Sequence, residues 1–229
     1  MNEYKKRLKP FLDDINKIKS DNVAILIRHS IRESHILGKI ISQYLLTEKG
    51  KELAFWFGKN LPKDRKIRIF YSPVERCKQT AIFIKKGLQL NKNIKIESIE
   101  KKEYLDTIVN NKEFDKLVKK YTCSKFVNKW INEEINDKII KNPNISFYQM
   151  MNEIILSMKK QKEKSLDIYI AHDFNIFLIR EFIFKNRNKN IEWPDYLDGI
   201  IISSENDNKI KLKWRKFEKI INWNSSLLE

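Results

Sequence analysis

Three short, largely apolar runs each end at a polar or basic cluster, and this pattern constrains the fold more than any other feature. The runs span residues 23–27, 67–71 and 168–171, and polar residues follow each run directly. Runs of this length are typical of strands buried inside a sheet. Segments with helical spacing separate them. The chain is therefore predicted to be an α/β protein whose ligand-binding residues lie where its strands end.

The remaining elements complete a layered arrangement. Alternation predicts a strand over 94–99, and two further apolar runs predict a closing hairpin. The block 105–164 has helical spacing throughout and is interpreted as a helical insertion laid over the sheet. The other predicted helices span residues 3–19, 47–61, 76–88 and 175–184, and the hairpin strands span 199–202 and 210–214.

The charge balance does not by itself indicate a nucleic-acid partner. The 229 residues carry a formal net charge of +16, but lysine is spread along the whole chain and arginine does not cluster. We therefore expect attraction to small anions and no dedicated nucleic-acid surface. No apolar run is long enough to span a bilayer. Two cysteines without metal-ligand spacing and an N-terminus without an apolar signal core favour the cytoplasm.

The first polar cluster, Arg28-His29-Ser30-Ile31-Arg32, has the composition of a phosphate site. A neutral imidazole such as that of His29 can attack phosphorus and hold the phosphoryl group until water removes it. Guanidinium groups at Arg28 and Arg32 disfavour the imidazolium form and bind phosphate oxygens through paired hydrogen bonds. On its own the cluster is equally consistent with basic side chains that pair with surface carboxylates at a strand end.

Two later clusters supply the other groups that a phosphate site needs. Arg76 follows the strand over 67–71, although an arginine in the first turn of a helix is more often solvated. His172 and Asp173 follow the strand over 168–171. His172 can donate a hydrogen bond to a phosphate oxygen, and Asp173 can protonate a leaving oxygen if its neighbours keep it protonated. Asp173 is also placed to cap the helix that follows.

Together these segments resemble the motifs of the histidine phosphatase superfamily, whose fold is also called phosphoglycerate-mutase-like. The matching segments are the RHG-type motif at 28–32, Leu-Thr-x-x-Gly at 46–50, Ser-Pro-x-x-Arg-Cys-x-Gln-Thr-Ala at 72–81 and Ala-His-Asp at 171–173. The resemblance covers nearly the whole chain. It implies one domain over residues 1–229: a three-layer α/β/α sandwich with a mixed, mostly parallel central sheet and a helical cap subdomain at 105–164 over the active site.

The resemblance also implies a role for each basic residue in these motifs. His29 is the implied phosphorylated nucleophile. Arg28, Arg32, Arg76 and His172 are the implied phosphate pocket, with His172 also counted among the catalytic residues. No cofactor is expected, and the sequence contains no acidic cluster of the kind that a metal site requires.

The proton donor distinguishes two branches of the superfamily. The acid-phosphatase-like branch carries it in a His-Asp pair, which corresponds to Asp173 here. The segment Tyr196-Leu197-Asp198-Gly199-Ile200 also resembles that branch. The branch that includes the mutases takes its acid from a glutamate after the second motif, and Glu97, Glu100 and Glu103 are the candidates for that role.

The chain departs from the superfamily pattern at two places. Ser30 stands where glycine is usual, and serine tolerates a positive φ poorly, so an altered loop is expected there. The arginine-proline continuation of the acid-phosphatase branch is replaced by Arg32-Glu33-Ser34-His35. For His35 we expect a solvated or structural role.

The sequence thus predicts a cytoplasmic, metal-independent phosphomonoesterase that hydrolyses a small phosphorylated metabolite through phospho-His29, with Asp173 as the proton donor. A phosphoglycerate-mutase-type phosphotransferase is the alternative enzyme. A non-catalytic phosphate-binding or interaction module of the same fold is the alternative outside catalysis. No specific nucleic acid or membrane partner is expected. The basic balance favours anionic substrates such as sugar phosphates or nucleotides without choosing among them.

Overall fold

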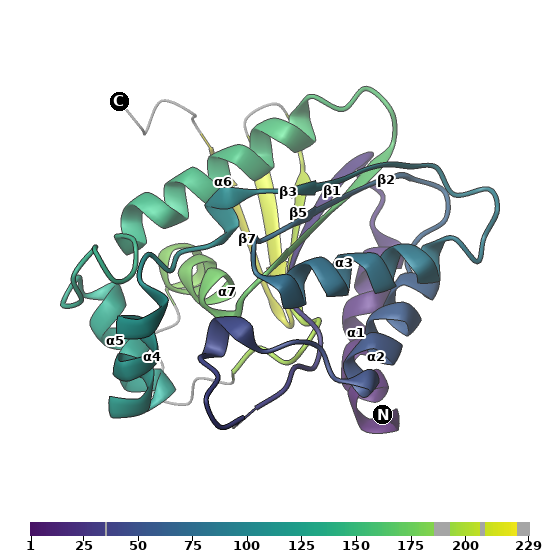
Figure 1. The fold of residues 1–229 in the computed structure, drawn as a ribbon. Coiled ribbons are helices and arrows are strands. Elements are labelled where there is room, and N and C mark those ends of the chain that lie inside the picture. The colour runs from purple at the N-terminus through teal and green to yellow at the C-terminus, as the bar shows by residue number, and fades with distance from the viewer. Residues whose placement is uncertain (35, 186–192, 207–208, 224–229) are drawn as a thin grey trace.

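A computed structural model describes residues 1–34, 36–185, 193–206 and 209–223. In these ranges the chain forms one seven-stranded sheet with helices on both faces (Figure 1). The strand order is β3-β2-β4-β1-β5-β6-β7. The strands are β1 (Asn22–Arg28), β2 (Lys66–Tyr71), β3 (Ile96–Lys101), β4 (Ser165–Ala171), β5 (Gly199–Ser204), β6 (Lys209–Trp214) and β7 (Phe217–Asn222).

The sheet is mixed, as the sequence predicts. β3, β2, β4 and β1 are mutually parallel, whereas β5, β6 and β7 extend the sheet with antiparallel pairings. The predicted hairpin corresponds to β5 and β6. The sequence interpretation did not include β7, an edge strand that alternates between half-buried and exposed residues and follows a tight turn at Arg215, where φ is 53°.

One face of the sheet is covered by the three N-terminal helices. These are α1 (Asn2–Lys17), α2 (Glu48–Lys59) and α3 (Glu75–Leu88). Their apolar residues pack against Val23, Ile25 and Ile27, the alternate residues of β1 that point to this side. Thr47 caps α2, because its hydroxyl accepts a hydrogen bond from the Gly50 amide at 3.0 Å.

The opposite face is covered by the later helices, which completes the predicted three-layer sandwich (Figure 1). Ala24 and Leu26 of β1 point into this second core. Among the described residues no helix has the length and apolar character needed to cross a membrane. The elements on this side are η2 (Glu103–Leu105), α4 (Asn111–Lys120), α5 (Cys123–Ile131), α6 (Pro143–Lys159), α7 (Asp173–Ile179) and the π-helical turn η3 (Arg180–Phe184).

The block 105–164 does not behave uniformly. Its longest helix, α6, packs against β1 and belongs to the outer layer of the sandwich. Helices α4 and α5 instead contact α7 and the short helix η1 (Ile41–Gln43) beside the sheet. The assignment of the whole block as one cap subdomain stays a prediction.

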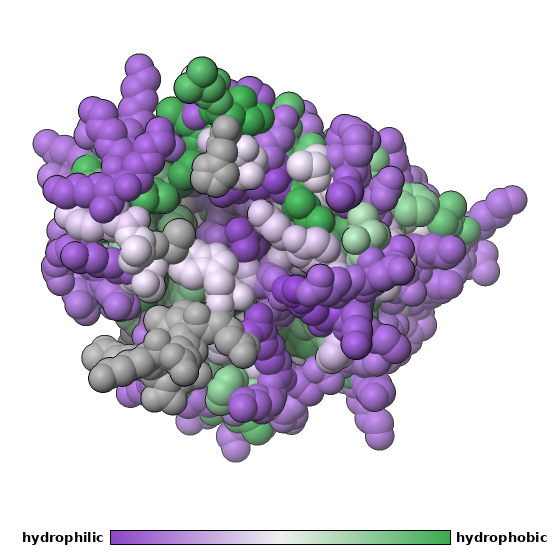
Figure 2. All heavy atoms as spheres, turned by 90° about the horizontal axis from the view of Figure 1, so that it is seen from below, coloured by the Kyte–Doolittle hydropathy of each residue, from purple (hydrophilic) through white to green (hydrophobic). Residues whose placement is uncertain are grey.

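Hydrophilic residues cover most of the molecular face that is seen from below (Figure 2).

Parallel pairing brings the three sequence motifs to one edge of the sheet. β1, β2 and β4 are neighbours, and their register places Arg28 beside Ala171 and Tyr71 beside Ile170. The residues that follow these strands therefore emerge side by side, as ligand-binding loops do in open α/β sheets.

Candidate active site

His29 follows β1 directly and is almost completely buried, with an exposed fraction of 2%. Its Nδ1 lies 2.8 Å from the carbonyl oxygen of Ser30, so Nδ1–H donates to that oxygen. Its Nε2 accepts a hydrogen bond from Nε of Arg76 at 3.0 Å. Burial, together with Arg76 and Arg28, holds the pKa of His29 well below its usual range. The imidazole is therefore neutral, and its lone pair is on Nε2.

His172 lies beside His29, with 5.6 Å between the two ring centres. Its Nδ1 accepts from Nη2 of Arg76 at 3.2 Å, which leaves Nε2–H to donate to the Ser72 hydroxyl at 2.9 Å. Burial and the nearby Arg76 charge hold the pKa of His172 well below its usual range as well. Both histidines are consequently neutral, and one guanidinium bridges them.

Arg76 is buried rather than solvated. It lies in the first turn of α3, and its exposed fraction is 4%. Besides its contacts with both imidazoles, Nη1 donates to the carbonyl oxygen of Ile41 at 2.9 Å. Arg32 also lines the pocket; its guanidinium lies 5.1 Å from the centre of the Tyr44 ring, and Nη1 donates to the carbonyl oxygen of Glu33.

Arg28 is held by residues from the far end of the chain. Nη1 donates to the Pro194 carbonyl at 2.7 Å, Nη2 forms an ion pair with Asp173 at 3.1 Å, and the guanidinium lies 4.3 Å from the centre of the Tyr196 ring. Its Nε is buried and has no hydrogen-bond partner within the described ranges.

Asp173 is ionised in this arrangement. Burial disfavours its charge, but the Arg28 guanidinium and a 2.9 Å hydrogen bond from Nε1 of Trp193 outweigh burial and lower its pKa. The N-cap residue of α7 is His172, whose amide donates to the side chain of Asn175. Asp173 is therefore the first helical residue rather than the cap, and its carboxylate faces the pocket.

The three glutamates considered as alternative acids lie away from this pocket. Glu97, Glu100 and Glu103 pair with Lys66, Lys102 and Lys101 respectively. The sequence interpretation missed a nearer carboxyl, Asp106, which interacts electrostatically with Arg76. Burial raises the pKa of Asp106 even though the neighbouring cations oppose this shift. Its place after β3, at the edge where the motifs meet, is the signal that identifies it.

Ser30 does not distort the loop as expected. It does not have a positive φ, and its hydroxyl donates to the Gly50 carbonyl at 2.7 Å while its amide donates to the Thr80 hydroxyl at 3.1 Å. Helix α2 approaches this loop so closely that a Cβ on Gly50 would lie 2.0 Å from the carbonyl oxygen of Ile31. Serine is therefore accommodated by the glycine opposite. His35 lies outside the described residues.

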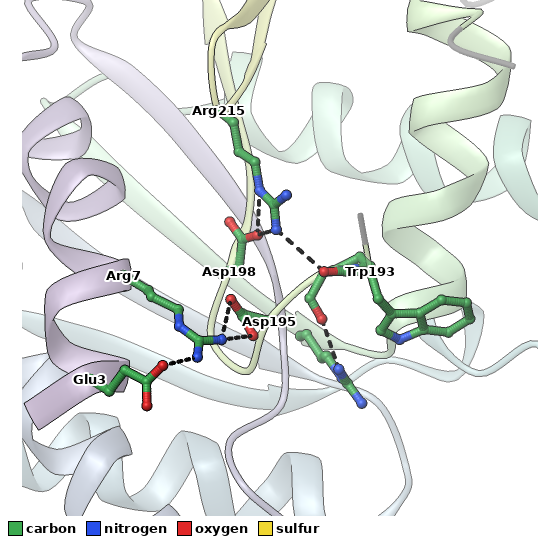
Figure 3. Close-up of polar contacts among 8 residues, drawn as sticks. Glu3, Arg7, Trp193, Asp195, Asp198 and Arg215 are labelled. Carbon is green, nitrogen blue, oxygen red and sulfur yellow. Dashed lines mark hydrogen bonds and ion pairs between the residues drawn. The ribbon is translucent and has the colours of Figure 1, made fainter. Parts of the chain in front are cut away.

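A larger cleft, of about 760 Å³, lies between α1 and the loop 193–198. Its carboxylates are paired, Asp195 with Arg7 and Asp198 with Arg215, and Arg215 also donates to the Trp193 carbonyl (Figure 3). No histidine or cysteine is among the described residues that line it. The described residues that line the pocket at His29, in contrast, include two neutral imidazoles and the guanidinium groups of Arg32 and Arg76.

The depressed histidine pKa values predict an acid-sensitive fold. Above pH 6.5 both the folded and the unfolded chain hold the histidines neutral. As the pH falls below 6.5, the unfolded chain binds protons that the folded chain cannot bind until its lower pKa is reached. Between pH 7.5 and 5.5 each buried histidine should lower the free energy of unfolding by about 1.4 kcal/mol. Urea unfolding of the wild type and His29→Asn at pH 7.5 and pH 5.5 tests this. The loss of unfolding free energy between the two pH values should be smaller in His29→Asn, and an equal loss in both proteins contradicts the prediction.

No family model matches the chain, and no curated protein matches it. Solved structures with a similar fold include the following three. A phosphoglycerate mutase from Bacillus anthracis has a TM-score of 0.57 at 16% identity, with 90% of this chain and 95% of that chain covered. A mycobacterial glucosyl-3-phosphoglycerate phosphatase has a TM-score of 0.55 at 13% identity, with 90% and 99% covered.

The third similar structure is a mutant phosphoserine phosphatase from Entamoeba histolytica in complex with phosphoserine. It has a TM-score of 0.52 at 17% identity, and the alignment covers 90% of this chain and 98% of that chain. In each case the alignment takes in nearly the whole of both chains. The chain therefore shares the fold of these proteins, the phosphoglycerate-mutase-like fold.

Proposed function

We propose that the chain is a phosphomonoesterase in which Nε2 of His29 attacks phosphorus. The observation that supports this most directly is the fixed tautomer of His29. The Ser30 carbonyl accepts a hydrogen bond from Nδ1–H, so the lone pair is on Nε2, which accepts a hydrogen bond from Arg76 Nε at 3.0 Å. A neutral, oriented imidazole beside buried cations is the arrangement that a phosphoryl-accepting nucleophile needs.

In the first step the bond from Nε2 to phosphorus forms as the bond from phosphorus to the ester oxygen breaks. As Nε2 bonds to phosphorus, it loses its hydrogen bond from Arg76. The N–H groups of Arg76 then donate to phosphate oxygens. Arg32, which lines the pocket, and Arg28, which pairs with Asp173 at its edge, stabilise the remaining negative charge. His172, neutral and bound by Arg76, completes the pocket.

Asp173 supplies the proton that the leaving oxygen needs. A phosphate dianion beside Arg28 competes for the guanidinium and repels the carboxylate, so we expect it to raise the pKa of Asp173 and let the residue bind a proton. Asp173 transfers this proton to the alcohol as the ester bond breaks. In the second step its carboxylate takes a proton from the water that attacks phospho-His29, and phosphate leaves.

The same proposal covers the wider setting of the reaction. The enzyme hydrolyses a small phosphorylated metabolite in the cytoplasm without a metal or cofactor. It acts as the acid-phosphatase branch does, with its proton donor in the His172-Asp173 pair. Residues 105–164 cap the active site, an assignment supported by α4, whose residues Phe114 and Val118 line the pocket. Metal independence is tested by assaying turnover in excess EDTA, which should leave kcat unchanged.

The direct test is to trap the phosphoenzyme. Mixing the enzyme with a ³²P-labelled monoester and quenching in alkali should leave label on the protein, because phosphohistidine withstands alkali and is lost in acid. Peptide mapping should place the label on His29 in the wild type and find none there in His29→Asn. Rapid phosphate release with no labelled protein at any quench time, or label on another residue, would contradict the proposal.

The two alternatives make different predictions in the same assay. A mutase would transfer the label to a second alcohol with no net release of phosphate. A non-catalytic binding module would acquire no label at all. The sequence reason for the binding module was Ser30, and its hydrogen bonds to Gly50 and Thr80 favour an intact loop over a damaged one.

A further inference from the structure

The pocket at His29 is lined by two chemically different sets of residues. One set is polar: it comprises the two imidazoles, Arg76, which contacts both of them, Arg32 and Asp173. The remaining wall is apolar, and within the described ranges no side chain along it offers an oxygen or a charged nitrogen. This wall, called the apolar wall below, consists of Ile41, Ile108, Phe114, Val118, Phe174 and Trp193.

Packing holds the apolar wall in place. The Phe174 ring meets Phe114 edge to face at 5.7 Å and also packs against Phe126 and Trp130 behind it. The Trp193 side chain has a single polar atom, Nε1, and this already donates to Asp173. A substrate group lying against the wall therefore meets carbon surface and no free hydrogen-bonding group.

In-line attack by His29 sends the leaving alcohol to the side of the phosphorus away from Nε2. The cationic groups hold the phosphate oxygens, so the carbon skeleton of the alcohol is left to the apolar wall. A polyhydroxylated alcohol would bury hydroxyl groups there without partners, which is costly. An alkyl or aryl group would instead gain from burial.

We propose, on the basis of the proposed function, that this site takes phosphomonoesters of apolar alcohols, alkyl or aryl, in preference to sugar phosphates. This differs from the expectation drawn from net charge, since the basic residues of the pocket are all used by the phosphate. No lysine is among the described residues that line the pocket.

The test compares n-hexyl phosphate with sorbitol 6-phosphate. Both are esters of primary alcohols with the same carbon skeleton length, and they differ in the hydroxyl groups on the other carbons. The value of kcat/KM should favour n-hexyl phosphate by about a hundredfold. Equal values, or a preference for sorbitol 6-phosphate, would overturn the substrate class and leave the proposed function standing. Hydrolysis of neither ester would overturn both.

A pair of valine substitutions shows whether the apolar wall causes the preference. Val118→Ser places a hydroxyl on α4 at the wall, and the ratio of the two kcat/KM values should fall by about tenfold. Val109→Ser makes the same chemical change at a residue that is 53% exposed and lies off the pocket, and it should leave the ratio unchanged. Equal ratios in wild type and Val118→Ser would exclude the wall as the source of the preference.

Discussion

Replacement of His29 by alanine is expected to lower kcat/KM for any phosphomonoester by about 10⁴-fold or more, since no other group in the pocket can take over nucleophilic attack. His172 cannot substitute, because its Nδ1 lone pair accepts a hydrogen bond from Arg76 and its Nε2–H donates to the Ser72 hydroxyl. Steady-state hydrolysis of phenyl phosphate measures the loss directly.

Two further variants separate a missing nucleophile from a damaged fold. His29→Asn retains a side-chain N–H that can donate to the Ser30 carbonyl, and it should be as inactive as the alanine variant while unfolding closer to the wild type. His172→Asn removes one contact to the phosphate pocket but leaves Nε2 of His29 in place, so it should lose only about 10²- to 10³-fold. Residual activity of the His29 variants within tenfold of the wild type would exclude His29 as the nucleophile.

The place where these residues meet could be predicted from the sequence. Buried apolar runs indicate parallel strands, and parallel strands end at one edge, so residues after 27, 71 and 171 must emerge together. The register confirms this, because Arg28 lies beside Ala171 in neighbouring strands and His29 and His172 follow them. Local pattern therefore identifies the strands, and topology brings the two histidines together.

The neighbours of those residues could not be predicted in the same way. Arg28 donates to a carbonyl 166 positions along the chain, at Pro194, and no local spacing encodes such a contact. The edge strand β7 was missed because its sequence mixes charged and apolar residues. Asp106 was missed because its burial depends on how the segments after β3 fold back over the sheet. The sequence does not distinguish it from the nearby glutamates, which pair with lysines.

The ionisation of Asp173 depends on the same long-range contacts. The sequence alone does not determine its protonation state. Arg28 and Trp193, which is 20 positions away, now lower its pKa and make it a carboxylate until a phosphate dianion competes for Arg28. If Asp173 is the proton donor, its importance must therefore depend on how much the leaving group needs a proton.

The effect of Asp173→Asn on kcat/KM should consequently depend on the leaving group of the substrate. For n-hexyl phosphate, whose alkoxide leaves only with a proton, kcat/KM should fall by about 10²- to 10⁴-fold. For p-nitrophenyl phosphate, whose phenolate leaves unaided, kcat/KM should stay within about tenfold, because this constant reports steps up to phosphorylation of His29. Its kcat should still fall, since the carboxylate that activates water in the second step is gone. Steady-state assays of both esters measure these changes.

Asp106→Asn is the matched control, because it makes the same carboxyl-to-amide change at the other buried acid that interacts with Arg76. It should change kcat/KM for the two esters by similar factors. A loss confined to n-hexyl phosphate in Asp106→Asn, with equal losses on both esters in Asp173→Asn, would transfer the proton-donor role to Asp106. The amide in Asp173→Asn carries no negative charge beside Arg28. Inorganic phosphate should therefore inhibit Asp173→Asn more strongly than it inhibits the wild type, whichever acid donates the proton.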